Sequence, residues 1–399
     1  MLRDFLTKHI SFLVMAASAA ALYFSNIFLS VNLGAQDYGK YGLFVSIVAV
    51  ANGFGFLGLD QALVRTARTS GRDSLMIDRR LFRFALLAGL GFFICATSYG
   101  VYGIGLPGLS LGVSVLATIL GLAGYAYGRV VRAYGFSQFA HGGARIVFFF
   151  CVLLLSQLNF GYEDVAWCYA ASSMTVGLFV VYVFSKSSFE SDLVERSDIL
   201  SFAVGYFFSM LIMNFIGFAD RFVIQDALGL EKAAAFFFYS NIYIYPFSLL
   251  ASYVGFKELS KYKQSFSMAD FHRDLGKSFR VAVGVAVLCC SSDYFGSILL
   301  GGFKFSLSLE EKMLMVLLGS GRILYSALSA VLGAVVEAKS LNLVNGFTFL
   351  AIACSWIALG FLEQTVVVIL ALFVGVWLAR SVAVYAVVWH ASLGASKSS

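Results

Sequence analysis

Two arginines lie inside long apolar stretches of the sequence, where ionisable side chains are rare. Arg322 lies ten residues after Lys312 and fifteen before Glu337, and Arg380 lies in the last apolar stretch. A charge at mid-membrane depth costs about 2.5 to 3.5 kcal/mol on insertion scales, so such a residue is a functional candidate. Because a planar guanidinium binds phosphate oxygens in pairs, both arginines are predicted to bind an anionic, phosphate-bearing group.

Each arginine also has an alternative interpretation. Arg322 would be structural if it only bonds neighbouring carbonyls, and Arg380 would be an anchor if its long side chain extends to the membrane surface. Arg145 and Arg65 lie at the inner ends of apolar stretches. They complete the predicted set of substrate-binding cations. The alternative is that both are anchors at the membrane interface.

Four carboxylates are candidates for coupling transport to a cation gradient. A carboxylate that alternates between protonated and ionised states can exchange H+ or bind Na+ during a transport cycle. The candidates are Asp60, Asp220, Asp293 and Glu337. Glu337 falls about 60° from Arg322 around a helix, which places the two on nearly the same face. Asp220 precedes Arg221, and a local ion pair is an equal alternative.

Uncharged polar residues complete the set of candidates. Asn26, Asn52, Asn214 and Asn241 could hydrogen-bond hydroxyl groups of a polar cargo, although most intramembrane asparagines bond a neighbouring helix. Pro246 lies mid-stretch and should kink its helix, because proline removes a backbone hydrogen bond. The six cysteines form no CxxC pair and have no histidine at ligand spacing, so neither a metal site nor a cofactor is predicted.

The elements that must position these residues follow from composition. Of 399 residues, 60% are hydrophobic and 13% charged, with a mean hydropathy of +0.86, whereas soluble domains carry about 25% charge. This composition excludes a soluble or disordered chain and indicates a polytopic, all-α membrane protein. Clusters of charge and glycine divide the chain into twelve predicted spans, at 10–33, 41–63, 82–103, 107–128, 142–159, 164–185, 199–222, 234–256, 278–300, 313–336, 341–362 and 365–390.

The positive charges support this division and predict an orientation. With twelve spans, 21 of the 28 lysines and arginines fall on one side and five on the other, and only Arg322 and Arg380 remain inside spans. Retained loops are cationic on the cytoplasmic side. Both termini are therefore predicted to be cytoplasmic. The basic residues form a topology signal rather than a nucleic-acid patch, so no nucleic-acid partner is expected.

An internal repeat suggests how the spans are grouped. At an offset of 195, Leu33-Gly34 aligns with Leu228-Gly229, Tyr41 with Phe236, Phe44 with Tyr239, Ile47 with Ile242 and Phe84 with Phe279. Six spans separate the copies, so the repeats are parallel. We predict one six-helix bundle over 1–185, a cytoplasmic linker over 186–198 and a second bundle over 199–399, with the two bundles around a central cavity.

The chain resembles the polysaccharide and oligosaccharidyl-lipid flippases of the MOP exporter superfamily, which include bacterial O-antigen flippases. The resemblance covers nearly the whole chain and rests on segments 33–42 (LGAQDYGKYG), 58–65 (GLDQALVR), 220–224 (DRFVI) followed by Leu228-Gly229, and 295–302 (FGSILLGG). The loop after the seventh span departs from the family pattern, because Ala233-Ala234-Ala235 stands where a glycine is usual.

This resemblance implies a function in glycan export. The expected activity is translocation of an undecaprenyl-pyrophosphate-linked oligosaccharide or polysaccharide repeat unit across the bacterial inner membrane by alternating access, coupled to H+ or Na+. Membrane lipids, a glycan polymerase and chain-length machinery are the expected partners, in the synthesis of O-antigen, lipopolysaccharide or exopolysaccharide.

Two other functions compete with this one. A cation-coupled multidrug exporter of the same superfamily would share the fold, but cationic drugs call for buried acids, whereas the deepest charges here are arginines. A polytopic glycan polymerase or transferase is the enzyme alternative. It is disfavoured because no outer loop is long enough for an active site and no Gly-rich nucleotide loop is present. We therefore expect a transporter and not an enzyme.

Overall fold

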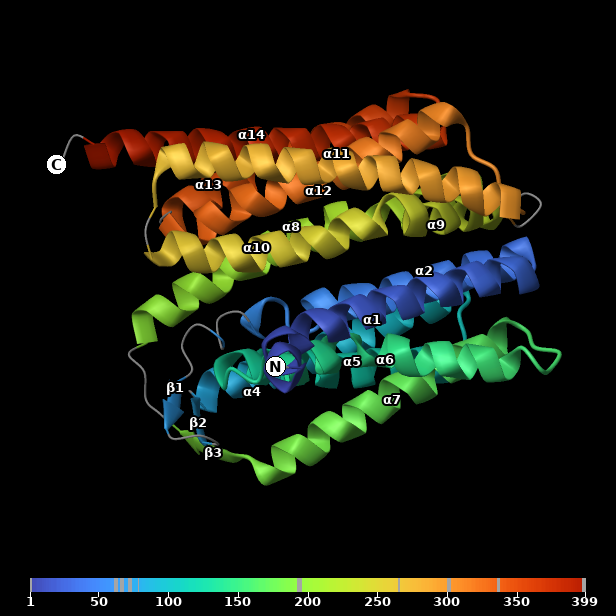
Figure 1. Cartoon of the computed structure of the whole chain (residues 1–399), viewed down its shortest axis with the longest axis horizontal. Helices are drawn as coiled ribbons and strands as arrows, with labels where there is room; N and C mark the ends of the chain where they lie inside the picture. The colour runs from blue at the N-terminus through green and yellow to red at the C-terminus, as the bar shows by residue number, and fades with distance from the viewer. Residues whose placement is uncertain are drawn as a thin grey trace. The chain divides into compact units, whose positions relative to one another are not determined.

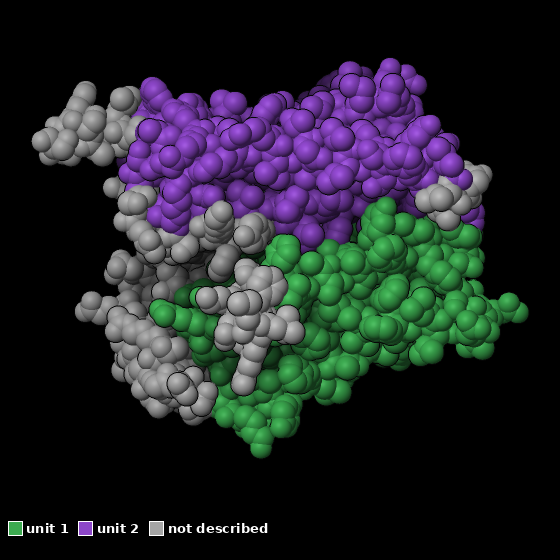
Figure 2. Space-filling view, viewed as in Figure 1, with its two compact units in different colours: residues 1–214 green, residues 215–399 purple. Residues whose placement is uncertain are grey.

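The structure is a computed structural model. It describes residues 2–60, 64, 68–70, 74–77, 79–191, 196–264, 266–299, 303–335 and 338–396. Long helices dominate it, because a helix satisfies its own backbone polar groups where no water is available. The chain divides into two compact units, Met1–Asn214 and Phe215–Ser399, which Figure 2 colours green and purple.

In the described part of the chain, the first unit contains six long helical segments (Figure 1). They are α1 (Leu2–Asn32), α2 (Ala35–Phe54), α4 (Arg79–Ser98) continued by the π-helical turn η1 (Tyr99–Gly103), α5 (Gly108–Val130), α6 (Tyr134–Leu155) and α7 (Tyr162–Lys186). Within this unit α1 packs on α6, and α5 packs on α6 and α7. The core between them is aromatic, with Tyr41 stacked on Phe148 at a ring distance of 6.0 Å.

The second unit repeats this plan. Its helices are α8 (Arg196–Leu228), whose first part belongs to the first unit, α9 (Leu230–Tyr243), α10 (Tyr245–Gln264), α11 (Met268–Leu299), α12 (Leu309–Val335), α13 (Ala338–Phe361) and α14 (Val366–Ser396). Helix α12 is central, because it packs against α10, α11 and α14. The functional candidates of this unit are therefore positioned mainly by α12 and its neighbours.

The predicted all-α membrane fold is confirmed. Among the described residues, ten helices are long and apolar enough to cross a membrane, and the bent pair α9–α10 makes eleven. Helix α2 occupies the remaining predicted span, 41–63, but it ends at Phe54. A turn follows in which Leu57 and Gly58 have positive φ angles of 53° and 81°, and this turn ends the helix earlier than hydropathy predicts.

A small sheet is one element that the sequence did not predict. Strands β1 (Arg68–Ser70), β2 (Ser74–Ile77) and β3 (Ser188–Ser191) pair in that order, β1 with β2 antiparallel and β2 with β3 parallel, with Ser74 opposite Ser188. The strands are too short to give a hydrophobic period that hydropathy could detect. They join the segment after α2 to the segment after α7, at one end of the first unit.

The internal repeat is visible in the local geometry. Gly34 and Gly229 each stand at the N-terminus of a helix, before α2 and α9 respectively, and Gly229 has a φ of 85° that favours glycine. Aligned residues also share their environment. Tyr41 and Phe236 are fully buried, whereas Phe84 and Phe279 are 63% and 58% exposed.

The division between the units lies inside α8, after Asn214. The predicted linker, 186–198, precedes that point and includes β3 and the first residues of α8. The bundle boundaries at 185 and 199, and the cavity between the bundles, stay predictions.

Candidate functional site

Arg322 extends from the middle of α12 toward two other helices of the second unit. Its Nη1 donates a hydrogen bond to Ser248 Oγ of α10 at 2.9 Å, and its Nη2 donates one to the Gly217 carbonyl of α8 at 3.0 Å. The guanidinium also lies 5.8 Å from the ring centroid of Trp377 in α14, within range of a cation–π interaction. The guanidinium therefore points toward protein groups and not into lipid.

Two further charged residues, Asp220 and Arg221 of α8, lie near Arg322. Asp220 is fully buried, and its Oδ1 accepts a hydrogen bond from the Arg221 backbone N–H at 2.9 Å. It is close enough to Arg221 and Arg322 for both to attract it electrostatically. No ion pair within 4.0 Å joins Asp220 to either arginine in the part of the chain that the structure describes, so the side-chain ion pair considered from sequence is not formed.

Three buried polar atoms of this cluster have no hydrogen-bond partner among the described residues. They are Nε of Arg322, Oδ2 of Asp220 and Nε of Arg221. Unsatisfied buried groups cost about 1 to 3 kcal/mol each, so such atoms point to a binding event that satisfies them. The cluster offers N–H donors to an anion and a carboxylate that can take up a proton. It is the strongest candidate site of the chain, and we call Asp220, Arg221 and Arg322 the charged cluster.

Arg380 lies in a different environment, enclosed among α12, α13 and α14. It is 0% exposed, its Nε donates to the Tyr325 hydroxyl at 2.8 Å, and its Nη1 donates to Thr348 Oγ1 at 3.0 Å. Both terminal nitrogens also lie 3.3 Å from Asn345 Oδ1. The side chain therefore does not extend to the membrane surface, and among the described residues it donates hydrogen bonds to neutral groups of α12 and α13.

Asp293 forms the ion pair that Asp220 lacks. Its Oδ2 accepts hydrogen bonds from Lys312 Nζ and from the Tyr243 hydroxyl, each at 2.8 Å. Lys312 also lies 4.6 Å from the ring centroid of Tyr239. These contacts join α9, α11 and the start of α12. The charge pattern places Lys312 in an outer loop, and only the tertiary structure brings it to Asp293, nineteen positions away.

The predicted residues of the first unit are spread over several helices. Asn52 Nδ2 donates to the backbone carbonyl of His141 at 3.1 Å, and Asn214 Nδ2 donates to the Met210 carbonyl at 2.9 Å. Asn26 and Asp60 are buried, and Arg145 is half-buried on α6. In the second unit, Asn241 Nδ2 donates to Phe237 O at 2.7 Å. Asn52 thus bonds a neighbouring helix, the alternative that sequence analysis left open, whereas Asn214 and Asn241 bond carbonyls of their own helices. Arg65 and Glu337 lie outside the described residues.

Sequence reasoning missed several residues that complete these sites. Ser248 and Trp377 hold Arg322, while Tyr325, Asn345 and Thr348 hold Arg380. Each is a polar or amphipathic side chain inside an apolar span. A polar residue inside an apolar span was the only indication in the sequence. Because Ser and Tyr are common in spans, it does not identify which of them contacts a given arginine.

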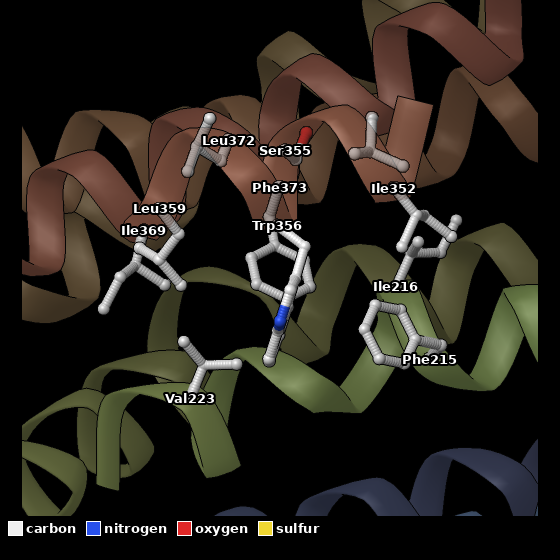
Figure 3. Close-up of a pocket in the computed structure, with 11 residues that line it drawn as sticks. Phe215, Ile216, Val223, Ile352, Ser355, Trp356, Leu359, Ile369, Leu372 and Phe373 are labelled. Atoms are coloured by element: carbon white, nitrogen blue, oxygen red, sulfur yellow. The ribbon is translucent and has the colours of Figure 1, made fainter. Parts of the chain in front are cut away.

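An apolar groove lies between α8, α13 and α14 of the second unit. Ten of its eleven lining side chains are apolar, and Ser355 is the exception. Phe215, Ile216 and Val223 line it from α8, and the indole of Trp356 extends toward them from α13 (Figure 3). Its composition suits a hydrocarbon and not a sugar.

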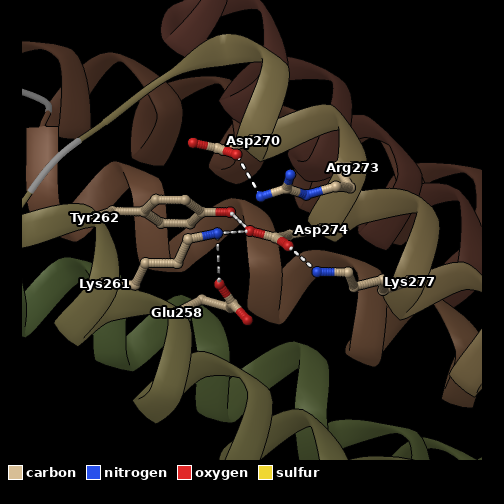
Figure 4. Close-up of polar contacts among 7 residues, drawn as sticks. All are labelled: Glu258, Lys261, Tyr262, Asp270, Arg273, Asp274 and Lys277. Carbon is tan, nitrogen blue, oxygen red and sulfur yellow. Dashed lines mark hydrogen bonds and ion pairs between the residues drawn. The ribbon is translucent and has the colours of Figure 1, made fainter.

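A second polar network ties the loop ends of α10 and α11 (Figure 4). Buried Asp274 accepts hydrogen bonds from Lys261, from Lys277 at 2.9 Å and from the Tyr262 hydroxyl at 3.2 Å. Lys261 also lies 3.9 Å from Glu258, and Arg273 pairs with Asp270 one turn away. Each cation in this network has a carboxylate partner, so the network stabilises the hairpin and is a weaker anion-site candidate than the charged cluster.

Solved structures with the same fold are membrane transporters and a flippase. An outward-facing multidrug resistance MATE family transporter of the MOP superfamily aligns with a TM-score of 0.58 at 16% identity, covering 98% of this chain and 95% of that one. The lipid II flippase MurJ in an inward closed conformation gives 0.61 at 13% identity, covering 97% and 87%. An inward-facing MATE transporter gives 0.54 at 16% identity, covering 96% and 98%. The sequence matches no protein-family model and no curated protein.

These similarities establish a fold shared with MATE transporters and the flippase MurJ. At 13 to 16% identity they establish the fold alone. The fold and the ten apolar helices make the chain a multi-pass membrane protein whose neighbours are transporters and flippases, not enzymes. These structures include a multidrug transporter and a lipid II flippase, so the shared fold does not specify the cargo of this chain.

Proposed function

We propose that the chain is a flippase that moves a lipid-linked, pyrophosphate-bearing oligosaccharide across the bacterial inner membrane by alternating access. The observation that carries the proposal is Arg322, a deep guanidinium with a buried, unbonded Nε. A pyrophosphate supplies paired anionic oxygens for Nε and a terminal nitrogen. The sequence resemblance to oligosaccharidyl-lipid flippases and the fold of MurJ both support a lipid-linked cargo.

Asp220 is the proposed coupling residue of this cycle. Its unbonded Oδ2 and the guanidinium of Arg322 attract each other when no cargo is bound. A bound pyrophosphate competes for Arg322, and the carboxylate left behind in an apolar environment then favours a proton or Na+. Cargo and cation would thus occupy the cluster alternately. Arg145, Arg65, Asp60, Asp293 and Glu337 stay candidates for further steps, and polymerase and chain-length proteins stay expected partners.

The test is complementation of a strain that lacks its own glycan flippase. We expect Arg322→Ala to insert at normal levels and to abolish surface polysaccharide. Arg322→Lys should restore only a fraction, since an ammonium lacks the paired geometry. Lys232→Ala is the matched control, because it removes an exposed cation of α9 in the same unit. Normal polysaccharide with Arg322→Ala would remove this residue from the mechanism.

Multidrug export is the second candidate function, and the MATE neighbours support it as strongly as MurJ supports the first. Buried Asp60 and Asp220 are the groups that a cationic drug would require. The same strain distinguishes the two functions. Drug resistance that the chain confers and Asp220→Asn abolishes, with surface polysaccharide absent, would favour export of drugs.

A further inference from the structure

Helix α11 exposes three cations near its N-terminal end and apolar side chains beyond them. Arg273, Lys277 and Arg280 follow one another at intervals of four and three residues, so they lie on one face of the helix. The side chains of Arg273 and Lys277 are 61% and 56% exposed, and Arg280 is exposed as well. Val287 and Leu288 continue the same face and are also exposed. The face is therefore cationic at one end and apolar along the rest.

Arg280 marks the level at which α11 enters the hydrocarbon of the membrane. Residues 281–299 contain a single charge, and at 1.5 Å per residue they span about 28 Å, close to the thickness of a hydrocarbon core. Aromatic residues gather at the same end of the helix. His272 Nε2 and the Tyr385 hydroxyl of α14 share a hydrogen bond at 3.1 Å, and Trp389 stacks on Tyr385 at a ring distance of 6.3 Å. Such aromatic side chains concentrate at the level of lipid headgroups.

The three cations differ in how far neighbouring carboxylates balance their charge. Arg273 pairs with Asp270, and Lys277 donates a hydrogen bond to Asp274 at 2.9 Å (Figure 4). Among the described residues, no carboxylate lies within 4.0 Å of the Arg280 guanidinium. Lys277 keeps two further N–H donors, because an ammonium carries three. An anion at this face can therefore bind Arg280 and share Lys277 with Asp274.

The surrounding segment favours an anionic partner and leaves room for it. Residues 257–280 contain six lysines and arginines and three acidic residues. Such a segment beside a membrane attracts anionic lipid, by about fivefold in affinity for each uncompensated cation. A Cβ placed on Gly276 or on Gly284 would meet no heavy atom within 4 Å. A headgroup beside Arg280, and the acyl chain that follows it, therefore meet no obstacle at these two positions.

We propose that α11 binds an anionic phospholipid of the leaflet on the predicted cytoplasmic side, with the phosphate between Lys277 and Arg280 and an acyl chain along the apolar face. Charge complementarity carries the assignment, since a lipid without net charge leaves the exposed charge of Arg280 unbalanced. The bound lipid fixes the depth of α11 in the bilayer. The site shares no residue with the charged cluster, and it does not depend on the identity of the cargo.

The test is lipid binding to the full-length protein in detergent, measured by native mass spectrometry. The probes are phosphatidylglycerol and phosphatidylcholine with the same acyl chains, and the readout is the affinity for the first lipid bound. For the unaltered protein we expect phosphatidylglycerol to bind at least about fivefold more tightly. Arg280→Gln should remove most of this preference without changing the binding of phosphatidylcholine. Arg280→Lys should keep most of it, because an ammonium still attracts a phosphate.

Arg273→Gln is the matched control, because it removes an exposed cation of the same face whose charge Asp270 already balances. Its preference for phosphatidylglycerol should change little. Arg280→Glu serves as a second variant if Arg280→Gln fails to fold, and it should lower the affinity for phosphatidylglycerol further.

Three results would overturn the inference. A preference that survives both neutralisation and reversal of the charge at Arg280 would exclude this residue from lipid binding. Equal losses in Arg280→Gln and Arg273→Gln would show diffuse attraction to the basic segment and no defined site. Displacement of the lipid by inorganic phosphate would assign Arg280 to a soluble anion.

Discussion

At the scale of single residues, the two deep arginines differ in how their donors are used. Arg322 keeps Nε unbonded near Asp220, whereas Nε of Arg380 donates to Tyr325 of α12 and its Nη1 to Thr348 of α13. A guanidinium with unsatisfied donors can accept a ligand, and one with its donors engaged by the protein holds helices together. We therefore expect two different roles, cargo binding for Arg322 and helix packing for Arg380.

Removal of Arg380 should accordingly reduce stability. Arg380→Ala leaves a cavity and strands the polar groups of Tyr325, Asn345 and Thr348, which we expect to cost about 1 to 3 kcal/mol or more. The melting temperature in detergent should fall by several degrees, while Ser381→Ala on the same helix should change it little. Unchanged melting together with lost transport would show that Arg380 binds cargo instead.

Asp220 gives a prediction about coupling. Asp220→Asn mimics the protonated side chain, so cargo movement in proteoliposomes should lose its dependence on an imposed pH or Na+ gradient. Asp226→Asn is the control, because Asp226 is exposed on the same helix. A gradient response that persists in Asp220→Asn would move the coupling role to another carboxylate.

At the scale of elements, the bent span α9–α10 is the most distinctive feature of the second unit. The two helices meet at Ile244 with a bend of 45°, as the position of Pro246 predicted. Hydrogen bonds hold both arms. Tyr243 bonds Asp293 on the α9 side, and Ser248 bonds Arg322 on the α10 side. An anion that binds Arg322 would therefore compete with the hydrogen bond that connects Arg322 to Ser248 of α10.

Replacement of the proline tests whether the bend is needed for transport. Pro246→Ala restores an N–H that can bond the Ile242 carbonyl and removes the ring that clashes there. We expect the span to straighten, which spin-label distances across the bend would measure, and transport to decrease. Pro107→Ala, at the start of α5, is the control proline variant. Normal transport by a straightened span would exclude the bend as part of the cycle.

At the scale of the whole molecule, the two units share the burial of aligned residues but differ in where their charged residues lie. Aligned positions such as Tyr41 and Phe236 share burial, so the repeat describes two units built on one plan. The second unit, however, holds the charged cluster, while the aligned positions of Asp220 and Arg221 in the first unit are Ser25 and Asn26. The two units therefore share a helix arrangement but carry different polar residues at these aligned positions.

The cationic loops predict that both termini face the cytoplasm. A fluorescent protein fused after Ser399 should fluoresce, and alkaline phosphatase at the same place should be inactive, because each reporter matures on one side only. A phosphatase inserted beside Lys304, in the predicted outer loop, should be active. The reverse pattern would contradict the orientation drawn from the lysines and arginines.

The sequence by itself determined the features that depend on local composition. Runs of about 20 apolar residues specify spans, a proline specifies a bend, and the glycines at 34 and 229 specify the breaks before α2 and α9. These properties are encoded within a few residues of each other. For the same reason the helices, the repeat and the bend agreed with prediction.

Only the tertiary structure decided which candidates have partners. Arg322 bonds Gly217, which is 105 positions away, and Arg380 bonds Asn345, which is 35 positions away. Helical periodicity gives the face on which a side chain lies, but it does not give the residue that packs against that face. The unbonded Nε of Arg322, the buried guanidinium of Arg380 and the apolar groove between α8, α13 and α14 all arise from helices that pack together after folding.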